Sequence, residues 1–137
     1  MYRLLFLLLL IISVFSCAKA ADIKGHINLD KEWSPVLYVS VINSFDDLHT
    51  ASYDFLRFQV AIDSTGYFEF KNLELDAEDR IYRLHLCKKG DPVSTIIIGG
   101  QEENFIHLIM NKESDITLRQ DESQPGFQFS IVEGQPF

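Results

Sequence analysis

His85 and Cys87 are the two residues whose types and spacing come closest to a metal site in this sequence. They lie two apart in an alternating segment, so both side chains are expected on the same face of a strand. An imidazole and a thiolate can bind a soft metal such as Zn²⁺, but two ligands are too few and no neighbouring residue completes the set. We therefore expect an exposed or half-buried strand face here, with no metal ion and no cofactor.

A second group of polar side chains, Asp46, Asp47 and His49, follows Phe45 in a segment of mixed character. Carboxylate oxygens from a loop suit Ca²⁺, which takes about six to eight oxygen ligands. Only two carboxylates are local, and an Asp at such a place also caps a turn through the neighbouring backbone. The segment is expected to be a loop or a single helical turn with Ser44 as its N-cap.

Catalytic signatures are missing from the sequence. Ser64 lies beside Asp63, but no histidine is adjacent to it and the G-x-S-x-G pattern is absent. Gly99 and Gly100 lack the remainder of a phosphate-binding loop. The acidic residues 74–79 could supply paired carboxylates, but such residues in a connection between strands are usually solvated. We therefore predict that the protein is not an enzyme.

Aromatic side chains and charged turns are the better candidates for a binding surface. Aromatic residues at strand ends and in a loop can recognise a peptide or a glycan, although the same residues also form a core and its rim. Binding residues also concentrate in surface turns. The candidate surface comprises Trp33, Tyr38, Phe45, Asp46, Asp47, His49, Lys88, Lys89, Glu102, Glu103 and Asn104.

Alternation of apolar and polar residues predicts the elements that position these side chains. It is clearest over residues 58–73, where two alternating segments flank the turn 63–66 and predict a β-hairpin with one buried face. Asp63 suits the first position of that turn and Gly66 the last, where glycine tolerates a left-handed backbone. Further strands are predicted over residues 22–29, 36–42, 80–88, 93–98, 104–110, 115–119 and 127–132. About seven to nine short strands without a long helical pattern predict an all-β, antiparallel β-sandwich.

The first twenty residues have the features of a secretory signal peptide. Arg3 supplies a positive charge, and residues 4–15 form an apolar run that only Ser13 interrupts. A helix of that length rises only about 18 Å, too short for a hydrocarbon core of roughly 30 Å.

Two processing sites compete within this leader. Ala18, Lys19 and Ala20 suit a signal peptidase that cleaves after Ala20. Residues 14–17 resemble a bacterial lipobox, which would make Cys17 the lipidated first residue and the only link to a membrane.

One domain is expected after the leader, with a β-sandwich over residues 21–119 and a polar linker and terminal strand-like segment over 120–137. The net charge of the whole chain is −8, and it becomes more negative without the two leader cations. An acidic domain without clustered Lys and Arg is a poor ligand for nucleic acid. With Cys17 removed or lipidated, Cys87 has no partner for a disulfide, so an apolar core must stabilise the domain.

A short motif resembles the pattern of carboxypeptidase regulatory-like domains, which are small prealbumin-like β-sandwiches. The motif consists of Asp63, Gly66, Phe68, Phe70 and Leu73, followed by Tyr82, Arg83 and Leu84. The resemblance covers about half of the chain after the leader. It implies a sandwich of the prealbumin or immunoglobulin type.

Several further segments are similar to the exported N-terminal part of Bacteroidetes envelope proteins that carry a transmembrane helix and a cytoplasmic helix-turn-helix further on. These segments are Trp33–Ser40, Ser44–Asp47, Tyr82–His85, Lys88–Lys89 and Ile98–Asn104. The resemblance implies an extracytoplasmic sensory or binding region. This sequence departs from the pattern because it has neither a later membrane span nor a DNA-binding helix pair. We expect a stand-alone relative or a truncated copy, and signalling to DNA is not carried over.

These observations together predict an exported, non-catalytic ligand-binding or sensory module in the periplasm or cell envelope of a bacterium. Its expected partner is a peptide, a glycan or an envelope protein. The alternative is a structural protein that contacts another envelope protein through a β-strand or an aromatic surface.

Overall fold

The computed structural model of the protein describes residues 20–121, 127 and 129–133. The predicted signal peptide, apart from Ala20, and the lipidation site Cys17 lie outside these residues. Among the residues described, no helix is both long enough and apolar enough to cross a membrane.

Eight strands and two short 3-10 helices make up the described part of the chain. The strands are β1 (Ala21–His26), β2 (Trp33–Ile42), β3 (Leu56–Ala61), β4 (Tyr67–Leu73), β5 (Arg80–Lys88), β6 (Phe105–Met110), β7 (Asp115–Gln120) and β8 (Phe129–Glu133). The helices are η1 (Asp46–His49) and η2 (Tyr53–Phe55). β8 falls within the strand-like segment that the sequence analysis placed after residue 120.

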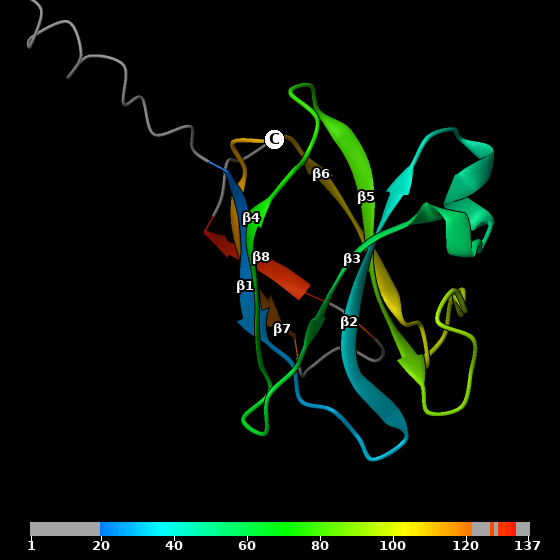
Figure 1. Ribbon diagram of the computed structural model, residues 1–137. Helices are drawn as coiled ribbons and strands as arrows, with labels where there is room; N and C mark the ends of the chain where they lie inside the picture. Colours follow the sequence, from blue (N-terminus) through cyan, green and yellow to red (C-terminus); the bar gives the residue numbers. More distant parts are fainter. Residues whose placement is uncertain (1–19, 122–126, 128, 134–137) are drawn as a thin grey trace, which may run out of the picture.

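Two four-stranded sheets pack face to face (Figure 1). Sheet A has the strand order β4-β1-β7-β8, and sheet B has the order β3-β2-β5-β6. Neighbouring strands are antiparallel, except that β1 and β7 are parallel at the centre of sheet A. The predicted all-β sandwich is confirmed.

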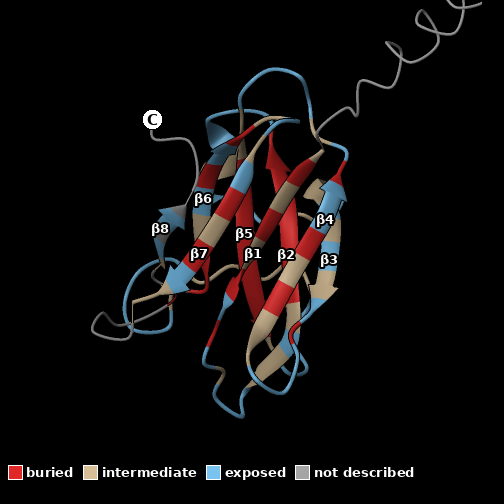
Figure 2. Cartoon of the chain, turned by 90° about the vertical axis from the view of Figure 1, so that its left-hand side faces the viewer, coloured by how far each residue is buried: buried red, intermediate tan, exposed pale blue. Residues whose placement is uncertain are grey.

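The core lies between the sheets and contains the apolar side chains that alternate along each strand. Sheet A contributes Ile23, Phe68 and Leu118, and sheet B contributes Val39 and Leu84. Figure 2 shows the alternation in β1, β4 and β7, whereas β2 is buried over residues 37–42 and β5 over residues 82–87. The centre of sheet B is therefore covered on both faces.

The predicted hairpin over residues 58–73 is wrong in its pairing. β3 pairs with β2 in sheet B, and β4 pairs with β1 in sheet A, so the two strands form an arch across the sandwich. Each segment does have one buried face, but the two faces enter the same core from opposite sheets. Alternation of apolar and polar residues indicates that one face of a strand is buried, but it does not indicate which strand is the neighbour.

The turn inside this arch is as predicted. The Gly66 N–H donates to the Asp63 carbonyl at 3.0 Å, and Gly66 has a φ of 86°. The Asp63 carboxylate accepts from the backbone N–H groups of Thr65 (2.8 Å) and Tyr67 (3.0 Å). The hydrogen bond from the Thr65 hydroxyl lowers the pKa of Asp63, and the two backbone hydrogen bonds lower it further.

Two segments without strands cover the outer face of sheet B. The helical arm comprises residues 43–55 with η1 and η2, and the covering loop comprises residues 89–104. The predicted strand over 93–98 is wrong, because this apolar run has no strand partner and lies irregularly in the covering loop. Residues 93–97 are half-buried because the loop packs on sheet B, whereas Ile98 is exposed. A loop that is partly buried in this way can have the same β-branched composition as a strand.

Candidate functional site

A pocket of about 130 Å³ lies at the end of the sandwich where β2 begins. We call it the end pocket. Both sheets contribute to it: Trp33 and Leu86 come from sheet B, and Gln120 comes from sheet A. The lining residues are Ile27, Asn28, Leu29, Asp30, Trp33, Leu86, Gln101, Glu103, Asn104, Gln120 and Phe127. Trp33, Glu103 and Asn104 belong both to this set and to the binding surface predicted from the sequence.

Asn104 holds the covering loop against β5 and so shapes one wall of the end pocket. Its side chain is 1 % exposed. The amide nitrogen donates to the carbonyls of Leu86 at 2.5 Å and Thr95 at 3.0 Å, and the amide oxygen accepts from the Ile97 N–H at 2.7 Å. An amide with all of these groups satisfied within the chain is a structural clamp.

Glu103 joins two further segments beside the pocket. Its carboxylate accepts from the Gly99 N–H at 3.0 Å, which folds the end of the covering loop. Its backbone carbonyl accepts from the Phe127 N–H at 2.8 Å, which places the Phe127 ring in the pocket wall. No short sequence pattern connects Phe127 with Glu103, so the sequence analysis missed this contribution.

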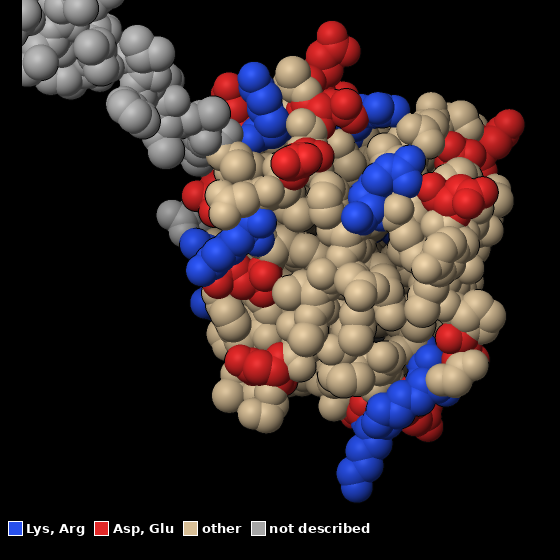
Figure 3. Space-filling view, in the orientation of Figure 1, with Lys and Arg blue, Asp and Glu red and all other residues tan. Residues whose placement is uncertain are grey.

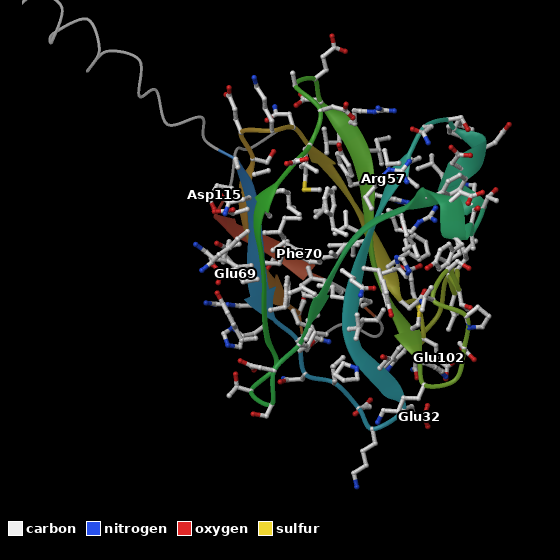
Figure 4. All side chains as sticks on the ribbon, in the orientation of Figure 1. Glu32, Arg57, Glu69, Phe70, Glu102 and Asp115 are labelled. Atoms are coloured by element: carbon white, nitrogen blue, oxygen red, sulfur yellow. The ribbon has the colours of Figure 1, made fainter. Side chains whose placement is uncertain are left out.

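Lys88 is at the centre of a charged rim on the same end of the molecule. Its ammonium group lies 2.9 Å from Glu102, 3.6 Å from Glu32 and 5.6 Å from the centre of the Trp33 ring. Figure 4 shows Glu32 and Glu102 close together at this end. The hydrogen bond that Lys88 donates to the Glu102 carboxylate raises the pKa of Lys88, so the side chain stays cationic and paired. Lys89 donates to the Lys31 carbonyl at 2.7 Å.

Two polar side chains at the end pocket are free to meet a ligand. Asp30 and Gln101 are exposed, and neither side chain has a hydrogen-bond partner among the residues that the structure describes. Trp33 lines the same pocket, is half-buried and packs against the core. An aromatic surface beside an amide and a carboxylate can bind a group that is flat and apolar on one side and rich in hydroxyls on its edge.

The outward side of β5 is buried, contrary to our expectation of an exposed or half-buried face. Arg83, His85 and Cys87 are each at most 2 % exposed, because the helical arm and the covering loop lie over them. The sequence of β5 alone does not reveal segments that approach from elsewhere in the chain.

His85 and Cys87 hold the covering loop. The Nε2 of His85 lies 2.8 Å and the Sγ of Cys87 3.1 Å from the same Val93 carbonyl. Because that carbonyl only accepts, Nε2 carries the proton, and the buried Nδ1 has no hydrogen-bond partner among the described residues. Burial raises the pKa of Cys87 to about 11, which keeps it a thiol. The described residues contain no group of three or more His, Cys, Asp or Glu placed to bind a metal ion.

We predict that the protein loses stability as the pH falls below about 6.5. Burial lowers the pKa of His85 below its ordinary value of 6.5, and Arg83 lowers it further. At a pH below about 6.5 the unfolded chain therefore binds more protons than the native state, and the free energy of unfolding decreases as the pH falls. This histidine contributes a slope of at most about 1.4 kcal/mol per pH unit. Urea denaturation at several pH values between about 7.5 and 5.5 measures it.

His85→Gln keeps a donor for the Val93 carbonyl but does not titrate, so its stability should depend less on pH. The residual slope reports His107, whose pKa is also lowered, first by burial and then by Arg83. Equal slopes in the wild type and in His85→Gln would contradict the prediction.

Arg83 fastens the helical arm to sheet B. Its guanidinium donates to the carbonyls of Asp47 (2.6 Å), Leu48 (2.8 Å) and Thr50 (3.0 Å), at the end of η1. The Nε donates to Nε2 of His107 at 3.4 Å. Carbonyl groups at a helix end carry partial negative charge and suit a cation, which explains how a buried arginine is accommodated without an ion pair. Burial lowers its pKa.

Asp47 shapes the turn that begins the arm. Its carboxylate accepts from the N–H groups of Asn43 (3.1 Å) and Ser44 (3.0 Å). The Asp46 carbonyl accepts from the Thr50 hydroxyl at 2.9 Å, and η1 has no side-chain N-cap. The predicted helical turn is present, with Asp47 reaching back to Ser44 rather than Ser44 capping it.

The candidate surface is thus divided between two places. Trp33, Lys88, Lys89, Glu102, Glu103 and Asn104 surround the end pocket, whereas Phe45, Asp46, Asp47 and His49 lie on the helical arm at the other end of β2. Tyr38 lies between them, buried on the outer face of sheet B with its ring stacked on His85 at 5.3 Å. Phe45 and Tyr53 on the arm are 79 % and 70 % exposed.

Comparison with known proteins returned no family. No family model matches the chain, and no curated protein and no solved structure is significantly similar to it.

Proposed function

We propose that the protein is a non-catalytic, ligand-binding module of a bacterial cell envelope, and that the end pocket binds one sugar ring of a larger glycan. The observation that carries the proposal is the free pair Asp30 and Gln101 beside the half-buried indole of Trp33. Carboxylate and amide groups next to an aromatic ring are suited to the hydroxyls and the apolar face of a sugar.

The size and charge of the end pocket favour binding of a single ring of a polymer over binding of a whole small metabolite. Its volume of about 130 Å³ is below the range of roughly 300–1,000 Å³ that encloses drug-sized ligands. Carboxylates at Asp30 and Glu103, with Glu32 and Glu102 on the rim, disfavour an anionic ligand. A neutral sugar ring fits both the small volume and the acidic surroundings, and the other rings of the same glycan can extend into solvent.

The resemblances found in the sequence support the location and the fold type within this proposal. The strand orders β4-β1-β7-β8 and β3-β2-β5-β6 agree with a prealbumin-like sandwich of the carboxypeptidase regulatory-like kind. Three of the segments similar to exported Bacteroidetes proteins, 33–40, 88–89 and 98–104, border the end pocket. We therefore also propose export to the periplasm or cell envelope, with cleavage after Ala20 or lipidation at Cys17.

A thermal-shift screen against neutral glycans tests the binding function. A glycan that binds only the folded state raises the melting temperature by mass action, by the equivalent of about 2.7 kcal/mol at a hundredfold excess over Kd. Gln101→Ala and Asp30→Ala remove the free polar groups without touching the core, so each should reduce or abolish the shift. Lys112→Ala, an exposed change in the turn before β7, should preserve it. A shift that survives in the Gln101 and Asp30 variants would place binding elsewhere.

A second function, attachment to another envelope protein, is favoured by the two exposed aromatic residues of the helical arm. It predicts no response to glycans, and a co-purifying protein that is lost in the double variant Phe45→Ser, Tyr53→Ser.

A further inference from the structure

A second and larger pocket opens between the sheets at the opposite end of the sandwich, with a volume of about 360 Å³. We call it the edge pocket, because it lies beside β3, an edge strand of sheet B. It is lined by Val41, Asn43, Arg57, Phe58, Glu74, Leu75, Asp76, Arg80 and Tyr82. In Figure 1 the β3 and β4 edges face the viewer, and Figure 3 shows that this side is largely uncharged between its two ends.

The floor of the edge pocket is apolar with one buried hydroxyl. Val41, Phe58 and Leu75 supply aliphatic and aromatic surface, and Tyr82 is 3 % exposed. The Tyr82 hydroxyl has two contacts with Asp76, to its N–H and its carboxylate, and both are 3.5 Å long. Good hydrogen bonds to a hydroxyl are about 2.7–2.8 Å, so this buried group is poorly satisfied and available to a ligand.

The charges around the edge pocket are of two kinds. Arg80 is already engaged, since its guanidinium lies 2.9 Å from the Asp76 carboxylate and donates to the Asn43 side chain at 2.8 Å. Arg57 donates only through Nη1, to the carbonyls of Asp54 and Leu56. Within the described chain neither Arg57 nor Glu74 takes part in an ion pair, although both line this pocket.

We propose that the edge pocket binds a free α-amino acid with an apolar side chain. Its carboxylate pairs with Arg57, its ammonium group pairs with Glu74, and its side chain lies on Phe58 and Leu75. Opposite charges that line one pocket without pairing are complementary to a zwitterion, which brings both charges on one small molecule. The side chain buries apolar surface, and the Tyr82 hydroxyl gains a closer acceptor in the ligand carboxylate.

The volume agrees with this class of ligand. A pocket of about 360 Å³ is at the lower end of the range of roughly 300–1,000 Å³ for small-molecule sites, which suits a molecule smaller than a drug. The lining carries two cationic and two anionic side chains and so has no excess charge. A simple anion therefore gains less electrostatic binding energy in this pocket than a zwitterion, particularly in a protein with a net charge of −8.

Isothermal titration of the full domain with leucine, isoleucine, valine, methionine and phenylalanine tests the proposal. At least one of them should bind at millimolar concentration. Leucinamide lacks the carboxylate and N-acetyl-leucine lacks the ammonium group, so both should bind at least about tenfold more weakly than leucine. Absence of binding by all five amino acids would overturn the proposal.

Two charge-neutral variants assign each end of the ligand. Arg57→Gln should weaken the binding of leucine by about tenfold and leave the binding of leucinamide unchanged. Glu74→Gln should weaken the binding of leucine and leave the binding of N-acetyl-leucine unchanged. Arg119→Gln and Glu113→Gln, which alter exposed charges elsewhere, should bind leucine like the wild type. Equal loss in the test and control variants, or no loss in either test variant, would refute the site. Gln101→Ala at the end pocket should have no effect, which separates this proposal from glycan binding.

Discussion

Replacing Gly66 with alanine is expected to reduce the free energy of unfolding by about 3 kcal/mol or more. Gly66 has a φ of 86°, where a side chain is strained, and an added Cβ would overlap the carbonyl oxygen of Ile27. The backbone cannot simply retreat, because the Ile27 N–H donates to the Gly66 carbonyl at 2.9 Å. Urea denaturation followed by circular dichroism measures the loss.

Gly90 provides a matched control for this substitution. It has a similar φ of 91°, but an added Cβ meets no atom within 4 Å. Gly90→Ala should therefore show only the left-handed backbone penalty of about 1–2 kcal/mol. If both variants lose the same stability, contact with Ile27 does not contribute, and the close approach of the arch turn to the end of β1 is not important for folding.

The second large effect is expected from Arg83→Met, which retains length and apolar packing but removes all donors. The carbonyls of Asp47, Leu48 and Thr50 then lose their partner, and the helical arm should detach from sheet B. We expect a loss of roughly 2–4 kcal/mol, because several buried acceptors become unsatisfied together. Hydrogen exchange should accelerate over residues 46–55 while the amides of β1 and β7 stay protected.

Two further variants make this result specific to the buried guanidinium. Arg119→Met replaces an exposed arginine and should change stability by less than about 0.5 kcal/mol. Arg83→Lys should be intermediate, because an ammonium group cannot reach three carbonyls with a planar fork. If hydrogen exchange in the helical arm is the same in Arg83→Met as in the wild type, contacts other than those of Arg83 hold the arm on sheet B.

The sequence predicted the strands well where one face alone is buried. β1, β4 and β7 show clean alternation and were placed within a few residues of their observed bounds. The partner of each strand was not predictable, because β3 and β4 show the same period whether they pair with each other or enter opposite sheets. Pairing depends on the whole topology and not on the local pattern.

The candidate site was predictable only in part, for a related reason. Trp33 and Lys88 are opposite one another across β2 and β5, and that register brings the aromatic ring and the charged turn together. Without this register, nothing in the sequence indicated that Trp33 and Lys88 lie side by side. Phe127 and Gln120 reach the same pocket from sheet A, and no local spacing indicates this. The burial of Arg83 could not be predicted, because the carbonyls that accept its hydrogen bonds precede it in the chain by 33 to 36 residues.

The parallel pairing of β1 with β7 has a kinetic consequence. β1 is the first strand of the sandwich, yet its neighbours in sheet A are β4 and β7, so Ile23 must meet Phe70 and Ile116. Ile23 is separated by 70 − 23 = 47 residues from Phe70 and by 116 − 23 = 93 residues from Ile116. Closing such long loops costs conformational entropy, and all-β domains dominated by long-range contacts fold in roughly milliseconds to seconds. Until β7 joins the sheet, the side of β1 that faces β7 stays unpaired, and an unpaired strand edge favours aggregation during folding.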